Sequence, residues 1–300
     1  MPNAKLKNYL HLHLLVFIAG FTAILGELIT ITAIPLVWYR MIIASVLMFA
    51  YIKIAKVKLS IRPKSVLKLS IAGIIIAAHW ITFFGAIDEA NISIALAMFS
   101  TGAFFASLIE PIVYKRKIIW YEILFGLIVI TGVIIITQSE IKYLTGIILG
   151  ISSAFLSSLF AVLNGSFLKQ HTATVISFYE FLSGVIFISL YLLFTTEGFN
   201  LKFFNLSTSD FFYLLILASV CTAYAFIASV HVMKLISPYT VVLTYNLEPI
   251  YGILIALILF PESEKMSASF YYGALLIIAT VILNGILKNS QKIKRKNHRL

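Results

Sequence analysis

The amino-acid sequence predicts an all-α integral membrane protein with ten transmembrane helices, arranged as two inverted five-helix repeats. Three observations lead to this fold class: the composition, the spacing of apolar runs, and a weak similarity between the two halves of the chain. Of the 300 residues, 61% are hydrophobic and only 12% are charged, and the mean hydropathy is +1.00. A soluble domain of this size cannot bury so much apolar surface, so most of it must face lipid.

The predicted helices are apolar runs of about 20 residues, the length that crosses a bilayer. The longer breaks between them are the basic loop 53–65, the basic segment 115–117 and the loop 195–210. The first run follows two lysines, as a signal peptide would, but it is long and a second run follows closely, which indicates an uncleaved helix. In order, the runs cover about residues 10–31, 35–52, 66–87, 92–113, 118–138, 145–168, 174–194, 211–232, 238–260 and 268–287.

The distribution of Lys and Arg predicts the orientation of these helices. If the loops alternate between the two sides, 19 of the 23 basic residues fall on one side and 3 on the other, with Arg40 inside a helix. Basic loops stay in the cytoplasm, so we expect both termini there and the protein in the plasma membrane. The basic tail, 288–300, is then a topology anchor. Nucleic acid is not an expected partner, because the Phe and Tyr residues lie inside apolar runs.

The two halves of the chain match weakly but in a consistent order. Residues 37–40 align with 177–180 at an offset of 140, and residues 90–93 align with 237–240 at an offset of 147. We therefore expect one five-helix repeat at 1–142 and a second at 143–287. Because five is odd, the second repeat is inverted in the membrane, which is a frequent plan of secondary transporters.

A family resemblance rests on the ten spans in two halves and on two short motifs. These motifs are Leu247, Glu248, Pro249, Ile250 and Tyr251 in the ninth span, and Phe260, Pro261 and Glu262 at its end. Together they resemble the EamA-type transporters of the drug/metabolite transporter superfamily. The resemblance implies export or exchange of small metabolites, amino acids in some members. Unlike the family pattern, the fourth span has Gly102 where a proline is usual.

Ionisable residues inside spans are the candidates for a substrate site, because such groups usually face a protein interior or a water-filled cavity. Glu27 and Arg40 have similar predicted depths, so they form either a structural ion pair or an anion-binding site in which the Arg40 guanidinium meets a carboxylate. Glu248 lies near the middle of its predicted span, beside Pro249. It is the candidate carrier of a coupling proton; the alternative is a protonated packing residue.

The remaining candidates are aromatic or polar residues at similar depths, for which core packing is the alternative interpretation. They are His79, Trp80, Tyr39, Tyr179, Tyr245 and Asn246. Pro249, Glu110 and Pro111 are assigned structural roles. Glu110 and Glu180 are both expected near the cytoplasmic face, the former beside basic residues.

These observations favour a secondary transporter of a small metabolite, working by alternating access around a central cavity. The partners expected are the substrate, membrane lipid and a proton as candidate coupling ion; neither a cofactor nor a metal is expected, because the only cysteine is Cys221 and no metal motif occurs. An enzyme is disfavoured by the absence of HExxH, GxSxG and nucleotide-binding motifs. The other alternative is a receptor or scaffold that transports nothing. The oligomeric state is left open.

The predicted orientation leads to a labelling experiment. With Cys221 replaced, a cysteine in the loop 195–210 should react with an impermeant thiol reagent added to intact cells. A cysteine at position 289 should react only after the membrane is permeabilised, because the basic tail is expected in the cytoplasm. Labelling of position 289 from outside would contradict the orientation.

Overall fold

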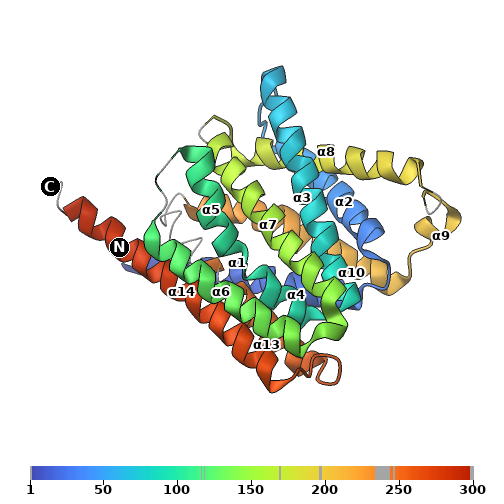
Figure 1. The fold of residues 1–300 in the computed structure, drawn as a ribbon. Helices are drawn as coiled ribbons and strands as arrows, with labels where there is room; N and C mark the ends of the chain where they lie inside the picture. The colour runs from blue at the N-terminus through green and yellow to red at the C-terminus, as the bar shows by residue number, and fades with distance from the viewer. Residues whose placement is uncertain are drawn as a thin grey trace.

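The computed structural model describes residues 2–115, 117, 119–168, 170–195, 198–233, 244, 245 and 247–297. All regular elements in these residues are helical (Figure 1). They are α1 (Pro2–Leu28), α2 (Ala33–Ile54), α3 (Pro63–Glu89), α4 (Ile92–Phe99), α5 (Gly102–Tyr114), α6 (Trp120–Ser139), η1 (Ile141–Tyr143), α7 (Leu144–Phe167), α8 (Ala173–Leu193), α9 (Leu201–Phe204), α10 (Thr208–Ala218), the π-helix η2 (Ser219–Tyr224), α11 (Ala225–Met233), α13 (Glu248–Leu259) and α14 (Ala268–Asn297).

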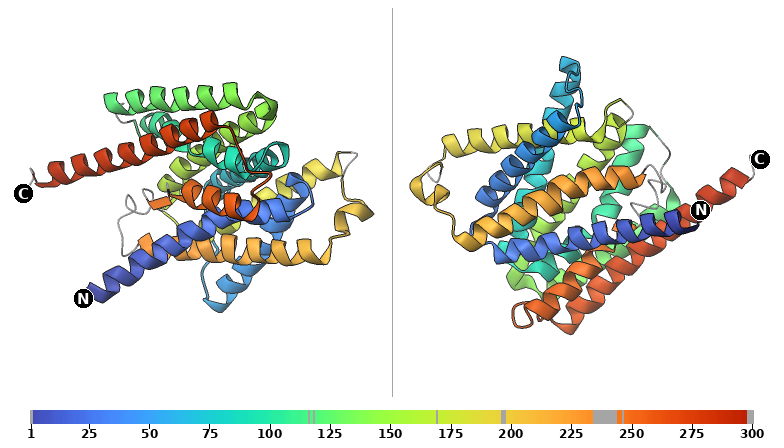
Figure 2. Two further views of the ribbon diagram at one scale, coloured as in Figure 1. Left: turned by 90° about the horizontal axis from the view of Figure 1, so that it is seen from below. Right: turned by 180° about the vertical axis from the view of Figure 1, so that it is seen from behind.

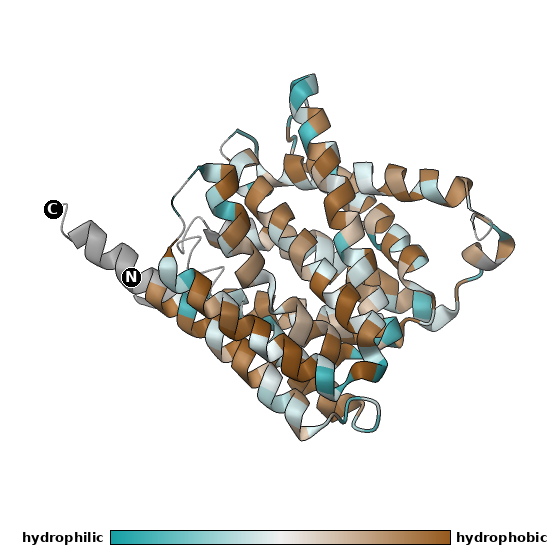
Figure 3. Ribbon diagram, in the orientation of Figure 1, coloured by the Kyte–Doolittle hydropathy of each residue, from teal (hydrophilic) through white to brown (hydrophobic). Residues whose placement is uncertain are grey.

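Nine segments within the described residues are long and apolar enough to cross a membrane, and α13 is a shorter apolar helix. The ninth predicted span, 238–260, lies partly outside the described residues. Large apolar side chains stay exposed along the helices, for example Leu124, Leu127 and Ile134 of α6. The hydrophilic residues gather toward helix ends and loops (Figure 3), which is the pattern of a protein surrounded by lipid.

Three of the predicted spans are interrupted rather than continuous. The fourth is divided into α4 and α5 at Ser100 and Thr101, whose hydroxyl groups donate to the carbonyls of Leu96 and Met98 at 2.9 and 2.7 Å. The eighth contains the π-helix η2 between α10 and α11. In the ninth, α13 begins at Glu248 itself. Side-chain hydroxyls can form hydrogen bonds with the backbone groups that such interruptions leave without a helical partner. The interruptions are therefore tolerated in a membrane.

The helix contacts are reciprocal between the two halves of the chain. The first span, α1, packs on α13 of the ninth, and the sixth span, α7, packs on α4 and α5 of the fourth. In the same way α3 packs on α8, while α2 packs on α10 and η2. The two fifth helices, α6 and α14, lie side by side, as Figures 1 and 2 show. Reciprocal pairs of this kind are what two similar five-helix units produce when they pack face to face.

Glycines make the closest of these crossings possible. Gly20 of α1 lies against the backbone of Glu248 and Gly252 in α13, Gly73 of α3 lies against the backbone of Glu180 in α8, and Gly132 of α6 lies against Gly273 of α14. Without a side chain in the way, the backbones approach closely and gain dispersion contacts, which is a common means of helix association in lipid. Two of these crossings fix the positions of glutamates.

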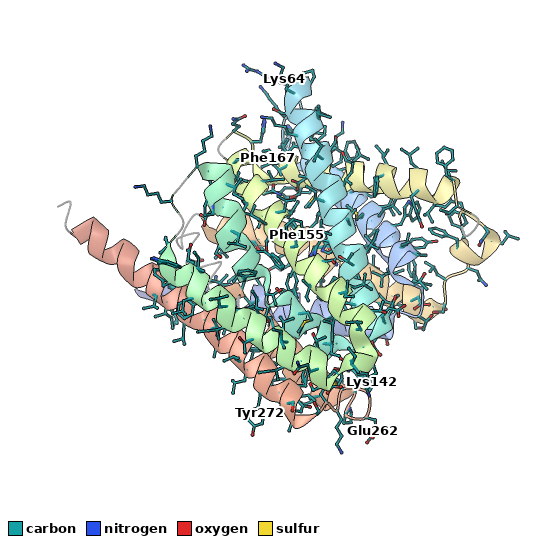
Figure 4. The ribbon with its side chains drawn as sticks, in the orientation of Figure 1. Lys64, Lys142, Phe155, Phe167, Glu262 and Tyr272 are labelled. Atoms are coloured by element: carbon teal, nitrogen blue, oxygen red, sulfur yellow. The ribbon has the colours of Figure 1, made fainter. Side chains whose placement is uncertain are left out.

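Labelled residues show which loops lie at each end of the bundle. Lys64, in the basic loop region, lies at the opposite end of the molecule from Lys142 and Glu262 (Figure 4). The start of α1 and the end of α14 lie on the same side of the bundle in both views of Figure 2. This arrangement agrees with the alternation of loops used to count the basic residues.

The Gly73 crossing can be tested by adding one methyl group. A Cβ at position 73 would overlap the carbonyl oxygen of Glu180, whereas a Cβ at Gly85, on the same helix, would lie 3.4 Å from Leu149, an ordinary contact. We expect Gly73→Ala to destabilise the protein by about 1–3 kcal/mol, the usual cost of overpacking. Gly85→Ala should be nearly neutral. Thermal unfolding of both variants in detergent measures the difference, and equal midpoints would contradict the close crossing.

Candidate functional site

A cavity of about 400 Å³ lies between α1, α2, α3, α4, α7, α8, η2 and α11, with Tyr245 and Glu248 also in its wall. Its wall is apolar over most of its area, with aromatic rings from Phe83, Phe99, Phe160 and Phe226. Polar and ionisable groups interrupt this wall at a few points, namely Arg40, His79, Asn164, Ser177, Glu180, Tyr245 and Glu248. A mostly apolar pocket with a few polar groups is the usual form of a small-molecule site.

Arg40 is the cation of the cavity and is only 3% exposed. Its guanidinium carbon lies 3.9 Å from the centre of the Trp80 ring and 5.6 Å from that of Phe84. The guanidinium Nε donates to the Thr222 hydroxyl at 2.8 Å. Stacking and one hydrogen bond hold the planar group in place. They leave Nη1 without a hydrogen-bond partner among the described residues.

The π-helix explains how Thr222 reaches Arg40. Thr222 is fully buried, and its hydroxyl donates to the carbonyl of Leu217, five residues earlier, at 2.8 Å. The same oxygen is therefore left as an acceptor that faces α2. A π-helix inserts one residue into a turn and rotates the side chains that follow, which is why such turns recur at functional sites.

Glu248 lies at the start of α13, where Gly20 brings α1 against its backbone. The sequence had placed it about eleven residues from either end of a continuous helix. Instead Pro249 occupies the first turn of α13, where its missing N–H costs no helical hydrogen bond. Glu248 and Arg40 interact electrostatically. Within the described residues they do not form a direct ion pair, and both residues line the cavity.

His79 and Tyr245 are held by hydrogen bonds to neighbouring helices. The Nδ1 atom of His79 lies 2.8 Å from the Ser153 hydroxyl and 3.1 Å from the Ser153 carbonyl, and the ring stacks on Phe99. Nε2 is therefore the ring nitrogen left to the cavity. The Tyr245 hydroxyl lies 2.8 Å from that of Ser229. Both residues contribute fixed polar groups to an otherwise apolar wall.

Other candidate residues lie away from the cavity. Glu27 is exposed and lies near Asp88 and Glu264, so in the described structure it does not pair with Arg40. The Tyr39 hydroxyl donates to the carbonyl of Phe203 at 3.1 Å, and its ring stacks on Phe203. Tyr179 donates to the carbonyl of Leu59 at 2.9 Å. Asn246 lies outside the described residues.

The structural candidates Glu110 and Pro111 lie in α5, with Glu110 partly exposed and Pro111 buried. Glu180 is a cavity residue that the sequence analysis did not select. It was expected near the cytoplasmic face, and it is 1% exposed and belongs to the cavity wall. Its alignment with Arg40 between the halves was the signal for this position. Among the described residues, no three His, Cys, Asp or Glu side chains gather as a metal site requires.

One end of the cavity lies at the turn between α7 and α8. Leu168, the residue after α7, and Ala173, which begins α8, both line it. At the opposite end of the bundle, carboxylates join the two halves of the chain through the turn before α2 and the start of α4. Asp210 accepts from the Thr30 N–H and hydroxyl at 2.7 and 2.8 Å. The buried Glu264 accepts from the first two N–H groups of α4, those of Ile92 and Ser93, at 2.9 and 2.8 Å.

Comparison with known proteins adds the family. A model of the EamA-like transporter family matches residues 6–138 and 144–286. The chain belongs to this family. A search of curated proteins gave no match. A solved structure described as "Crystal structure of protein" is similar to 94% of this chain and 98% of its own, with 14% sequence identity and a TM-score of 0.64, which shows a shared fold.

Family membership makes the chain a multi-pass membrane transporter of the drug/metabolite type. It implies a small-molecule substrate and a lipid environment. The EamA-like family is a transporter family rather than an enzyme family. The two matched segments each contain five of the predicted runs and are separated at residues 139–143.

The contacts of Arg40 predict how its variants behave. Arg40→Ala removes the charge and the stacking on Trp80, so we expect uptake into liposomes to fall to background. Arg40→Lys keeps the charge but loses the planar group and its fixed hydrogen bond to Thr222, so we expect partial activity. Thr222→Val, which keeps the shape of the side chain, should reproduce the Lys defect in part. Wild-type uptake by Arg40→Ala would contradict a role for this guanidinium.

Proposed function

We propose that this protein is a secondary transporter, an exporter or exchanger, of a small metabolite such as an amino acid. The observation that carries the proposal is the cavity of about 400 Å³ with buried ionisable groups in its wall. A charged group inside a membrane protein is costly unless it faces a cavity, a partner or a ligand. Arg40 is suited to a carboxylate, because its guanidinium is planar and held by Trp80 and Thr222.

The proposed architecture is ten transmembrane helices in two inverted repeats, 1–142 and 143–287, with the basic tail 288–300 in the cytoplasm. The reciprocal packing of α1 on α13 and of α7 on α4 and α5 supports it. So do the matching interruptions: α5 begins at Gly102, and the offset of 147 relates this residue to Pro249, in the first turn of α13. Discontinuous helices at corresponding positions are frequent at the binding sites of inverted-repeat transporters.

The two ends of the cavity support alternating access. By the proposed orientation in the plasma membrane, the cavity end at Leu168 and Ala173 faces the cytoplasm. The opposite end of the bundle faces outward, where Asp210 and Glu264 join the halves through Thr30 and the start of α4. Hydrogen bonds from helix N-terminal N–H groups to a carboxylate are strong but confined to one geometry. Rocking of one half against the other would break them and open the outer side.

Glu248 is the proposed site of proton coupling. It lies at the start of α13 beside the cavity and interacts electrostatically with Arg40. A substrate carboxylate that binds Arg40 changes the charge next to Glu248, and a change in the protonation of Glu248 changes the field at Arg40. Substrate and proton are thereby linked through two neighbouring groups without the need for direct contact between them.

The coupling role predicts different outcomes for two variants of Glu248. Glu248→Gln mimics the protonated form, so we expect it to abolish the response to a pH gradient while the protein stays folded and exchanges substrate. Glu248→Ala should be worse in both respects, because it also removes packing at the start of α13. The measurement is a metabolite uptake screen in liposomes, first with a proton gradient and then with a substrate gradient alone. Wild-type pH dependence in Glu248→Gln would exclude coupling through this residue.

A further inference from the structure

Two buried polar atoms in the cavity wall have no hydrogen-bond partner among the described residues. They are Nη1 of Arg40 and Oε1 of Glu180, and their side chains are 3% and 1% exposed. Nearly all buried polar groups in proteins have a partner, so each exception requires an explanation. Both atoms belong to residues that line the same cavity. A ligand bound there is the simplest partner for both.

The positions of these two residues are equivalent in the two halves of the chain. Arg40 lies seven residues after the start of α2, and Glu180 lies seven residues after the start of α8. They also align with one another in the repeat at the offset of 140. Symmetry-related positions therefore carry opposite charges. The cavity is consequently polarised, with a cationic group from α2 and a carboxyl group from α8, the helix whose first residue, Ala173, also lines it.

Helix contacts show that the two residues lie at different levels along α8. The end of the Met41 side chain, next to Arg40, packs on Gly184 in α8. Gly184 is four residues from Glu180, which is roughly 6 Å along the helix axis. Glu180 interacts with the side chain of Asn164 on α7. Its backbone is fixed by the close approach of Gly73.

We propose that the cavity binds a bipolar molecule whose acid and amine lie at opposite ends of a short apolar chain. Its carboxylate meets Arg40, and its ammonium group meets Glu180 and Asn164. This inference rests on the proposed transport function and adds the charge pattern of the substrate and its orientation. The chain between the two groups packs on the apolar wall, which includes Phe99 and Phe160. Glu180 is then the residue that selects for the amine.

Equilibrium binding to the full-length protein in lipid nanodiscs tests this proposal without requiring transport. The probes are radiolabelled 6-aminohexanoate and competing members of the series from 4-aminobutanoate to 8-aminooctanoate. Two controls have one charge each, hexanoate and hexylamine. A third, norleucine, has the same atoms as 6-aminohexanoate but carries both charges at one end. We expect the best member of the series to bind roughly 10-fold to 100-fold more tightly than each control, the usual effect of one charged hydrogen bond.

Three variants distinguish recognition from folding. Glu180→Gln should remove the preference for the amine and leave the binding of hexanoate unchanged. Glu180→Asp retracts the carboxyl group by one carbon, so it should shift the preferred probe to a longer chain. Glu262→Gln, the same change at an exposed carboxylate outside the cavity wall, should change neither. Thermal unfolding of each variant checks that it is folded.

The outcomes separate this inference from the proposed function. If no member of the series binds better than the single-charge controls, or if Glu180→Gln keeps the amine preference, the inference is wrong. Uptake of another metabolite by liposomes in that case would leave the transport function standing. If the series binds as expected but liposomes take up no metabolite under any gradient, transport is wrong and the charge pattern of the site stands.

Discussion

The burial of the Arg40 guanidinium inside a membrane protein is the constraint around which the cavity is built. An ionised group in hydrocarbon is too costly to leave unsatisfied, and Arg cannot lose its proton at any physiological pH. Trp80 and Phe84 cover its faces, and Thr222 accepts from Nε. The two rings come from α3 and the hydroxyl from η2, so the charge on α2 is enclosed by the packing of three elements.

The interrupted helices are a second consequence of the same need. A continuous helix uses all its backbone donors and acceptors internally and offers a ligand only side chains. At η2 the π turn directs the Thr222 hydroxyl to Arg40, and at α13 the helix begins with Glu248 beside the cavity. The fourth span is interrupted at the equivalent position, although it has Gly102 and no proline there. Two of the interruptions thus place polar groups beside the cavity. At the interruption of the fourth span, serine and threonine hydroxyls donate hydrogen bonds to backbone carbonyls.

Carboxylates lie in two different environments in this molecule, and the groups that they contact distinguish them. Glu264 and Asp210 accept hydrogen bonds from backbone N–H groups of the other half of the chain and close one end of the bundle. Glu180 and Glu248 instead line the cavity and make no such bonds to helix ends within the described residues. The first pair joins the two halves of the chain, and the second pair lies where a ligand in the cavity would meet it.

The sequence by itself determined the membrane class, most of the helices and the family motifs, because hydrophobicity and length are local properties of each segment. It also selected Arg40 and Glu248, since charges inside apolar runs are conspicuous. It did not determine which side of each helix faces inward. Only the tertiary structure separated Glu27 from Arg40, placed Glu180 in the cavity wall and began α13 at Glu248. The physical reason is that helix rotation and backbone interruptions depend on close crossings such as that of Gly73 with α8, which join residues far apart in the chain.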